Sequence, residues 1–378
     1  LAEANSAATH GVLLAIASWV LFVILGALFI EPYFSMLDAS AEVKEMAITY
    51  TSIVVFVSIG RFLEVNLEKT LQATGNMIYP MLFQLVGAVT NIILDPIFIF
   101  GFLGVPAMGI AGAAIATVLS RYIETAIIVV YTHTRKEYFP FIHGAYRSLR
   151  VPSPLMSGIL RRGTPLLVNE FLWSSGMAVL LQCYSVRGLD VVAACNIATT
   201  VSNLFKVVFL SMGNAVAIMV GQALGANDIE RAKNCTWRLM TAAVGSNLFM
   251  SILLILFAPS IPHIYNTEPH VRQIATQLLY VIAMMMPAYS FSHCCYFTLR
   301  SGGKTIITFL FDSVFTWCVN VPTAWLLAYR TGMGIVPLYF CVQALELIKV
   351  VIGFALVKKG VWIHNIVAPV AEKEAAEK

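Results

Sequence analysis

Ten apolar stretches follow one another along this sequence, and each is long enough to cross the hydrocarbon core of a bilayer as a helix. Charged residues make up 12% of the chain, against about 25% in a typical soluble domain, and the mean hydropathy is +0.80. We therefore predict an all-α polytopic membrane protein. The stretches cover residues 11–31, 47–66, 77–102, 108–131, 165–186, 191–219, 238–258, 274–297, 305–328 and 333–357.

Basic residues gather in alternate loops between these stretches. Arg135 and Lys136 follow the fourth stretch, and Arg231 and Lys233 follow the sixth, whereas the loop after the fifth contains only Arg187 as a basic residue. Loops rich in Lys and Arg stay on the cytoplasmic side. Because the number of stretches is even, we expect both termini in the cytoplasm.

One long polar loop divides the chain. It contains Pro140, Gly144, Pro152 and Pro154, which interrupt regular structure. This loop is interpreted as a linker between two lobes. The expected domains are an N-terminal lobe of four helices (1–132), a cytoplasmic linker (133–163), a C-terminal lobe of six helices (164–358) and a cytoplasmic tail (359–378).

The two halves share an internal repeat. A constant offset pairs Leu71 with Leu299 and Gly75 with Gly303, at the same point between spans in both copies. The second copy has two further spans before its match to Leu1 begins, so we expect two parallel six-helix lobes with ten of twelve helices present. The first two helices would then be missing from the N-terminus. Parallel repeats of this kind place the substrate in a central cleft between the lobes.

Two blocks resemble a known family. The run NIILDPIFIFG from Asn91 to Gly101, followed by GIAGAAIAT from Gly109, resembles the fifth-to-sixth-helix signature of the multidrug and toxic compound extrusion (MATE) transporters. VGQALGA from Val220, with Arg231-Ala232, is similar to the family's element after its eighth helix. The resemblance implies twelve helices in two lobes, a location in the bacterial inner (plasma) membrane, and export of organic cations driven by Na+ or H+ entry.

Ionisable residues at membrane depth are costly, so they are candidates for function. Glu170 is the strongest, since it lies in the fifth stretch beside Asn169 and one turn before Trp173. A carboxylate there can bind a coupling cation and release it when a substrate cation arrives. A Na+ at Glu170 is the only metal site that we expect, and no cofactor is indicated apart from the coupling ion. The alternatives are a structural ion pair and a helix-cap group near the cytoplasmic end.

The sixth stretch carries polar residues at helical spacing, together with Lys206, which needs an anion in a low-dielectric site. We hypothesise that Glu170 on the neighbouring helix is that anion, in either a structural or a coupling role. Arg121 with Glu124, and Glu346 with Lys349, are spaced to neutralise each other on one helix face. The remaining substrate or ion-binding candidates are Asn196, Thr200, Asn203, Tyr289, Asp312, Gln343 and Glu346.

The sequence departs from the family pattern at two positions. The resemblance implies an acid where Trp173 stands and another in the tenth family helix, where alignment places Tyr289. Glu170 lies one turn before Trp173 on the same helix face. The coupling ion, Na+ or H+, therefore stays open.

The function that we expect is secondary active antiport of amphipathic organic cations by alternating access. The expected partners are these small molecules and the lipid bilayer, with no nucleic acid, and the chain is expected to be a monomer and not an enzyme. One alternative is a lipid-linked oligosaccharide flippase of the same wider superfamily, which would need a cleft rich in Arg and Lys, where only Lys206 and Lys349 are placed. A membrane-embedded enzyme is a weaker alternative, because no HExxH or paired aspartates occur.

Overall fold

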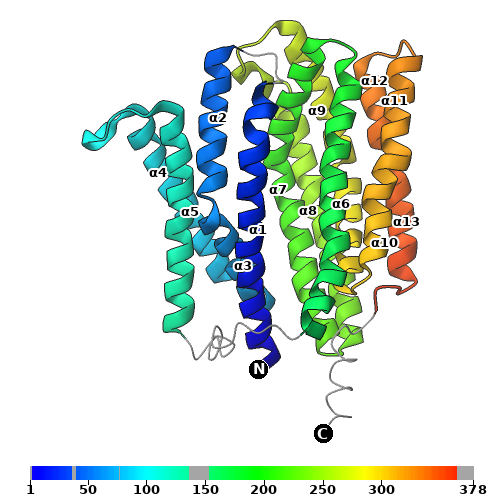
Figure 1. Ribbon diagram of the computed structural model, residues 1–378. Helices are drawn as coiled ribbons and strands as arrows, with labels where there is room; N and C mark the ends of the chain where they lie inside the picture. Colours follow the sequence, from blue (N-terminus) through cyan, green and yellow to red (C-terminus); the bar gives the residue numbers. More distant parts are fainter. Residues whose placement is uncertain (1, 36–39, 76, 136–152, 364–378) are drawn as a thin grey trace. The chain divides into compact units, whose positions relative to one another are not determined.

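The computed structural model describes residues 2–35, 40–75, 77–135 and 153–363, and all regular structure in these ranges is helical (Figure 1). Part of the predicted linker, residues 136–152, and the predicted tail beyond residue 363 lie outside the described residues. The main helices are α1 (Ala2–Ser35), α2 (Ala41–Phe56), α3 (Ile59–Ala73), α4 (Ile78–Phe100), α5 (Gly109–Thr134), α6 (Ser153–Ser185), α7 (Leu189–Gly225), α8 (Ile229–Phe257), α9 (Pro269–Ser301), α10 (Thr305–Phe309), α11 (Val321–Arg330), α12 (Ile335–Ala344) and α13 (Glu346–Lys358). Between α10 and α11 lie two π-helical segments, η4 (Leu310–Val314) and η5 (Thr316–Asn320), and two short 3-10 helices are η1 (Phe102–Gly104) and η3 (Ile261–Ile264).

The predicted ten crossings are confirmed by length and composition. Within the described ranges, nine helices or continuous helical runs are apolar enough to cross a membrane, and the pair α2–α3, bent by 49°, makes a tenth. Large apolar side chains are exposed along them, including Leu28 at 60% and Ile92 at 69%. Such surfaces match a lipid solvent, so the chain is a multi-pass membrane protein.

The chain divides into two compact units, Leu1–Gly158 and Ile159–Lys378. The division falls inside the segment interpreted as a linker. In the first unit, which contains helices α1 to α5, a small core of Leu71, Phe83 and Ile128 joins α3, α4 and α5. A Cβ atom at Gly112 of α5 would overlap the Phe98 carbonyl of α4, so this glycine permits close contact between the two backbones.

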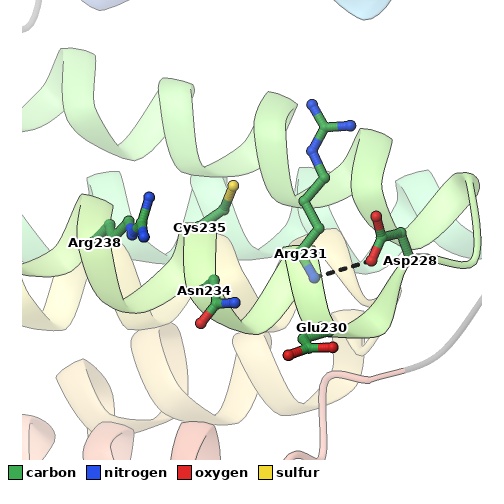
Figure 2. Close-up of a pocket in the computed structure, with 6 residues that line it drawn as sticks. All are labelled: Asp228, Glu230, Arg231, Asn234, Cys235 and Arg238. Atoms are coloured by element: carbon green, nitrogen blue, oxygen red, sulfur yellow. Dashed lines mark hydrogen bonds between the residues drawn. The ribbon is translucent and has the colours of Figure 1, made fainter.

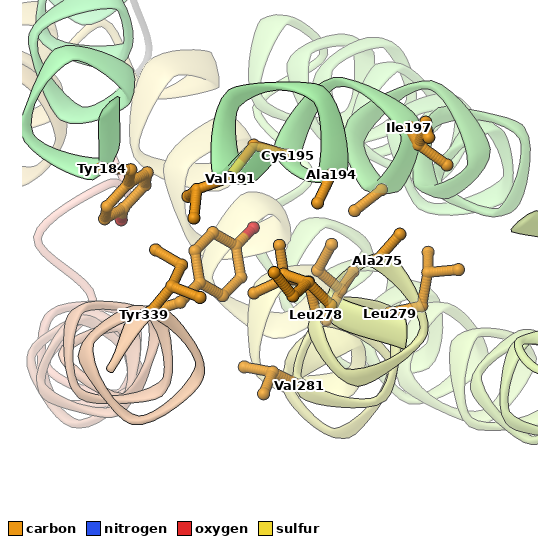
Figure 3. Close-up of a cluster of buried hydrophobic side chains, with 14 of the residues drawn as sticks. Tyr184, Val191, Ala194, Cys195, Ile197, Ala275, Leu278, Leu279, Val281 and Tyr339 are labelled. Atoms are coloured by element: carbon orange, nitrogen blue, oxygen red, sulfur yellow. The ribbon is translucent and has the colours of Figure 1, made fainter. Parts of the chain in front are cut away.

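The second unit contains the larger cores. One of them joins α6, α7, α9 and α12 through side chains that include Tyr184, Cys195, Leu278 and Tyr339 (Figure 3). A second core joins α7, α8, α9 and α13. Dispersion contacts and fit between these side chains, more than a hydrophobic driving force, hold helices together in lipid.

The repeat is visible in local geometry. Gly75 and Gly303 both have positive φ, at 90° and 72°. Each donates its backbone N–H across the same kind of turn, Gly75 to Gln72 O and Gly303 to Arg300 O, both at 2.9 Å. Only glycine adopts this backbone region readily, so both copies use the same residue at the same turn.

The two copies differ where their helices become irregular. The first copy breaks between α2 and α3, whereas the corresponding α9 runs unbroken from Pro269 to Ser301. The second copy has π-helical turns in η4 and η5, and a break at Leu345 between α12 and α13. Each irregularity lies beside an ionisable residue: Arg61 at the first, Asp312 at the second and Glu346 at the third.

Candidate functional site

A buried ionic network lies inside the second unit. The Lys349 ammonium is 3.1 Å from Asp312 Oδ1 and 3.7 Å from Glu346 Oε1. The side chains of Lys349, Asp312 and Glu346 are 12%, 17% and 11% exposed. Two carboxylates thus share one ammonium, and with all three groups ionised the network carries one excess negative charge.

Asn169 on α6 connects this network to neighbouring helices. Its Nδ2 donates to Asp312 Oδ2 and to Tyr296 Oη, both at 3.3 Å. Ser313 Oγ donates to Asn169 Oδ1 at 2.7 Å and to its backbone oxygen at 2.8 Å. Asn169 is 2% exposed, and these contacts fix its side chain. It holds Oδ2 of Asp312, whereas Lys349 binds Oδ1.

The helix irregularities position the charged groups. Asp312 lies within η4, and its backbone oxygen accepts from Thr316 Oγ1 at 2.9 Å. Glu346 directly follows Leu345, where a turn interrupts the helical run from Ile335 to Lys358. Lys349 follows three residues later and lies on the same face. π-Bulges frequently occur at functional sites, and here one holds the carboxylate nearest to the lysine.

Glu170, the strongest candidate from the sequence, lies outside the network. Its side chain is 63% exposed, and its partner is Arg300, 36% exposed, at an N–O distance of 4.0 Å. An exposed pair at this distance contributes little to stability. Trp173, one turn further along α6, is also exposed. The structure therefore brings Asn169, and not Glu170, to the buried charges.

The hypothesis that Lys206 pairs with Glu170 is wrong. Lys206 Nζ instead lies over the ring of Tyr289, 5.9 Å from its centre. Tyr289 in turn donates its hydroxyl to Gln343 Oε1. A cation over an aromatic face is stabilised without a carboxylate, which explains how Lys206 is held with no ion pair among the described residues. Three predicted candidates, Lys206, Tyr289 and Gln343, are thus brought together.

The predicted polar residues of α7 do not join either group. Asn196, Thr200 and Asn203 are exposed, while Ala194, Ile197, Ala198 and Val201 on the same helix are buried. The pairing of Glu346 with Lys349 is confirmed, and so is that of Arg121 with Glu124 at 2.8 Å. Sequence reasoning missed the closer contact of Lys349 with Asp312, and it missed Tyr296 and Ser313. The available signal was the presence of Asp312 and Lys349 within two different apolar stretches.

A separate polar cavity of about 440 Å³ lies at the start of α8 (Figure 2). Asp228 caps this helix by accepting from the Arg231 backbone N–H at 3.0 Å. This cap explains the polar residues next to the VGQALGA element as a helix start. The cavity contains none of the predicted binding residues. It is lined by Asp228, Glu230, Arg231, Asn234, Cys235 and Arg238.

Comparison with known proteins gives consistent matches. A family model described as MatE matches residues 2–97 and 165–326. The chain is 26% identical over 320 residues to the probable multidrug resistance protein YoeA of Bacillus subtilis (strain 168), covering 84% of this chain and 68% of that protein. It is 24% identical over 327 residues to the probable multidrug resistance protein NorM of Oceanobacillus iheyensis, covering 86% and 72%.

Solved structures share the fold. The crystal structure of MATE in complex with MaL6 matches with a TM-score of 0.85 at 21% identity, covering 94% of this chain and 79% of that chain. The outward-facing conformation of a multidrug resistance MATE family transporter of the MOP superfamily matches with the same TM-score and identity, covering 94% and 78%.

Proposed function

Because the chain belongs to the MatE family of multidrug efflux transporters, we propose that it exports amphipathic organic cations in exchange for Na+ or H+. The observation that carries this proposal is the excess carboxylate in the network of Asp312, Glu346 and Lys349. We propose a bacterial plasma membrane as its location, with both termini cytoplasmic, and a monomer as its functional state.

The network suits a coupling-ion site because its charge balance changes when one cation binds. The carboxylate of Glu346 lies farther from the Lys349 ammonium than that of Asp312 does. A proton or Na+ bound to Glu346 would bring the net charge of the network to zero. Without that cation, Asp312 and Glu346 compete for one ammonium in a site with little access to water, where unbalanced charge is costly. Binding of the coupling ion is therefore linked to the arrangement of α6, η4 and α13, whose side chains meet here.

Exchange of an organic cation for a coupling ion follows if the two cations compete for the negative charge of this network. An organic cation near the network and a coupling ion on it are mutually repulsive, so binding of one lowers the affinity for the other. A change of charge at Asp312 can reach a second helix through Asn169, because Asn169 donates hydrogen bonds to both Asp312 and Tyr296. Coupling needs only that the two arrangements differ in affinity for the two cations.

The flippase alternative is less well supported. A pyrophosphate carrier needs a cationic site, whereas this network has two carboxylates around its single lysine. The other candidate cation, Lys206, lies over Tyr289 and is one isolated charge. The charge of the site therefore favours cationic substrates.

The test is ethidium efflux from cells that express the full chain, with Na+ present or absent and with a proton uncoupler. Asp312→Asn is expected to abolish ion-dependent efflux, and Glu346→Gln to reduce it at least tenfold. Glu170→Gln is the matched comparison, because it removes a more exposed carboxylate, and it should keep most of the activity. Ion-dependent efflux by Asp312→Asn at the unmodified rate, or no efflux by the unmodified chain in any condition, would contradict the proposal.

A further inference from the structure

The first unit contains a second group of buried charges that the proposed coupling site does not use. The buried face of α3 consists of Gly60, Glu64, Glu68 and Leu71, at a spacing of four, four and three residues. Two of the four are acids, with Glu64 0% and Glu68 4% exposed. An amphipathic helix normally buries its apolar stripe, so two buried acids on this face require a specific explanation.

A third acid on α5 joins this face. Glu124 is also 0% exposed, and its Oε2 accepts from Arg121 Nη1 at 2.8 Å. On α3, Arg61 donates to Glu64 Oε2 in the same i,i+3 arrangement. On α4, Gly87 leaves space for Glu124, because a Cβ atom there would overlap the carboxylate.

The two pairs form one cluster. Thr125 Oγ1 on α5 donates to the Gly60 carbonyl of α3 at 2.8 Å and ties the two helices together. Glu64 and Glu124 interact electrostatically with each other, and Arg61 and Arg121 each act on both glutamates. The break between α2 and α3 lies just before Arg61. Interrupted membrane helices commonly supply the ion sites of transporters.

One oxygen of each glutamate has no partner. Glu64 Oε1 and Glu124 Oε1 are buried and accept no hydrogen bond from any described residue. The third acid is satisfied differently, because Gln72 Nε2 donates to Glu68 Oε1 at 2.5 Å. A buried carboxylate oxygen without a donor costs about 1–3 kcal/mol or more. Both unpartnered oxygens belong to the two acids that interact across the α3–α5 contact.

A proton would satisfy the unpartnered oxygens. Glu68 is linked through Gln72 to the ammonium of Lys69, which donates to Gln72 Oε1 at 3.0 Å, so the two unpartnered oxygens are those of Glu64 and Glu124. One proton would convert one of these two acceptor oxygens into a donor. A Na+ would require a shell of several oxygens, whereas the unpartnered carboxylate oxygens of the described cluster are two, Glu64 Oε1 and Glu124 Oε1.

Groups on the other neighbouring helices form no ion pair with Glu64 or Glu124 in the described part of the chain, where the partners are Arg61 and Arg121. Helix α4 presents the uncharged Gly87. Helix α1 contributes His10, 1% exposed, whose Nε2 is buried with no partner among the described residues. The charges of α2, at Glu42, Lys44 and Glu45, lie at the start of that helix, away from its junction with α3.

We propose that Glu64 and Glu124 form a proton-binding site in the first unit, in which the two carboxylates share one proton. The site uses none of the residues of the network around Asp312, so either proposal can fail while the other stands. Arg61 and Arg121 limit the site to one proton, because each guanidinium stabilises the ionised form of its own partner. Gain and loss of this proton changes the balance of charge beside the α2–α3 break.

The test is infrared difference spectroscopy of the purified full chain, which detects the carbonyl stretch of protonated carboxyl groups at a series of pH values. Glu64→Gln and Glu124→Gln are each expected to remove one carboxyl per molecule from the spectrum. The double variant should remove no more than either single one, because the proton is shared. Glu42→Gln is the matched control on the exposed start of α2, and it should leave the spectrum unchanged.

Three further measurements keep the result interpretable. Asp312→Asn should leave this signal intact, which separates it from the proposed coupling site. Glu64→Asp keeps a carboxyl group and should shift the band without removing it, which excludes loss of folding as the cause. Persistence of the band in both Gln variants, additive losses in the double variant, or removal of the band by Na+ at constant pH would overturn the proposal.

Discussion

Lys349 Nζ lies 3.1 Å from Asp312 Oδ1, and this contact joins η4 to α13 through two residues that are 37 positions apart in the chain. The same ammonium lies over the ring of Phe311 at 5.3 Å. Lys349 is therefore enclosed by an aromatic face and two carboxylates.

Removal of the lysine is expected to be strongly destabilising. Lys349→Met would leave Asp312 and Glu346 buried without a counter-charge, which typically costs about 3–5 kcal/mol. The measurement is the free energy of unfolding in mixed detergent micelles. The double variant Lys349→Met with Asp312→Asn should recover a large part of that loss, and the same loss in both variants would show that the ion pair is not its cause.

Removal of the Asn169 amide should loosen the network without changing its charge. Asn169→Ala removes the donor to Asp312 Oδ2 and one of the two acceptors of Ser313 Oγ, for which we expect a loss of about 1–3 kcal/mol. Asn196→Ala on α7 is the control, because Asn196 is exposed, and such substitutions usually change stability by less than about 0.5 kcal/mol. Equal effects of the two substitutions would refute the bridging role of Asn169.

The α4–α5 contact should not tolerate a methyl group. Gly112→Ala would force the new Cβ against the Phe98 carbonyl, and overpacking of this kind costs about 1–3 kcal/mol. Gly245→Ala in α8 is the control, since no atom lies within 4 Å of a Cβ at that position. That change should stabilise the helix by up to about 1 kcal/mol. Thermal unfolding of both variants distinguishes the two effects by their opposite signs.

The pair between Glu170 and Arg300 should be almost silent in stability measurements. Both side chains are substantially exposed at an N–O distance of 4.0 Å, and such pairs contribute about 0–1 kcal/mol. Glu170→Gln and Arg300→Gln should each change the unfolding free energy by less than about 1 kcal/mol, and the change should be smaller at high salt. A salt-independent loss of several kcal/mol would place Glu170 in a buried network after all.

The fold was largely predictable because lipid imposes a simple rule. A span needs about 20 apolar residues, and that length is visible without any knowledge of packing. The turn at Gly75 and Gly303 was also predictable, since a glycine stands at the same point of both copies in the sequence, and both have positive φ in the structure. The π-helical turns around Asp312 were not, because an extra residue per turn leaves no mark in an apolar pattern.

The candidate sites were predictable only as separate residues. Asp312 and Glu346 are conspicuous as charges within apolar stretches, but their common partner depends on which helix faces meet in three dimensions. Glu64 was missed for another reason. It stands near the end of the predicted stretch 47–66, between Arg61 and Lys69, where a charged residue is expected to face water, so its burial could be seen only once α3 had packed against α5.

The π-helical stretch from Leu310 to Asn320 gives its helix a property that a regular rod lacks. A π turn contains one extra residue relative to an α-helical turn, and this extra residue can shift along the helix while the turns on both sides stay regular. When the π turn shifts by one residue, the side chain at the position that it leaves rotates by about 100° around the helix axis. For Asp312, such a step would redirect the carboxylate from Lys349 to a different neighbour while both helix ends stay in place.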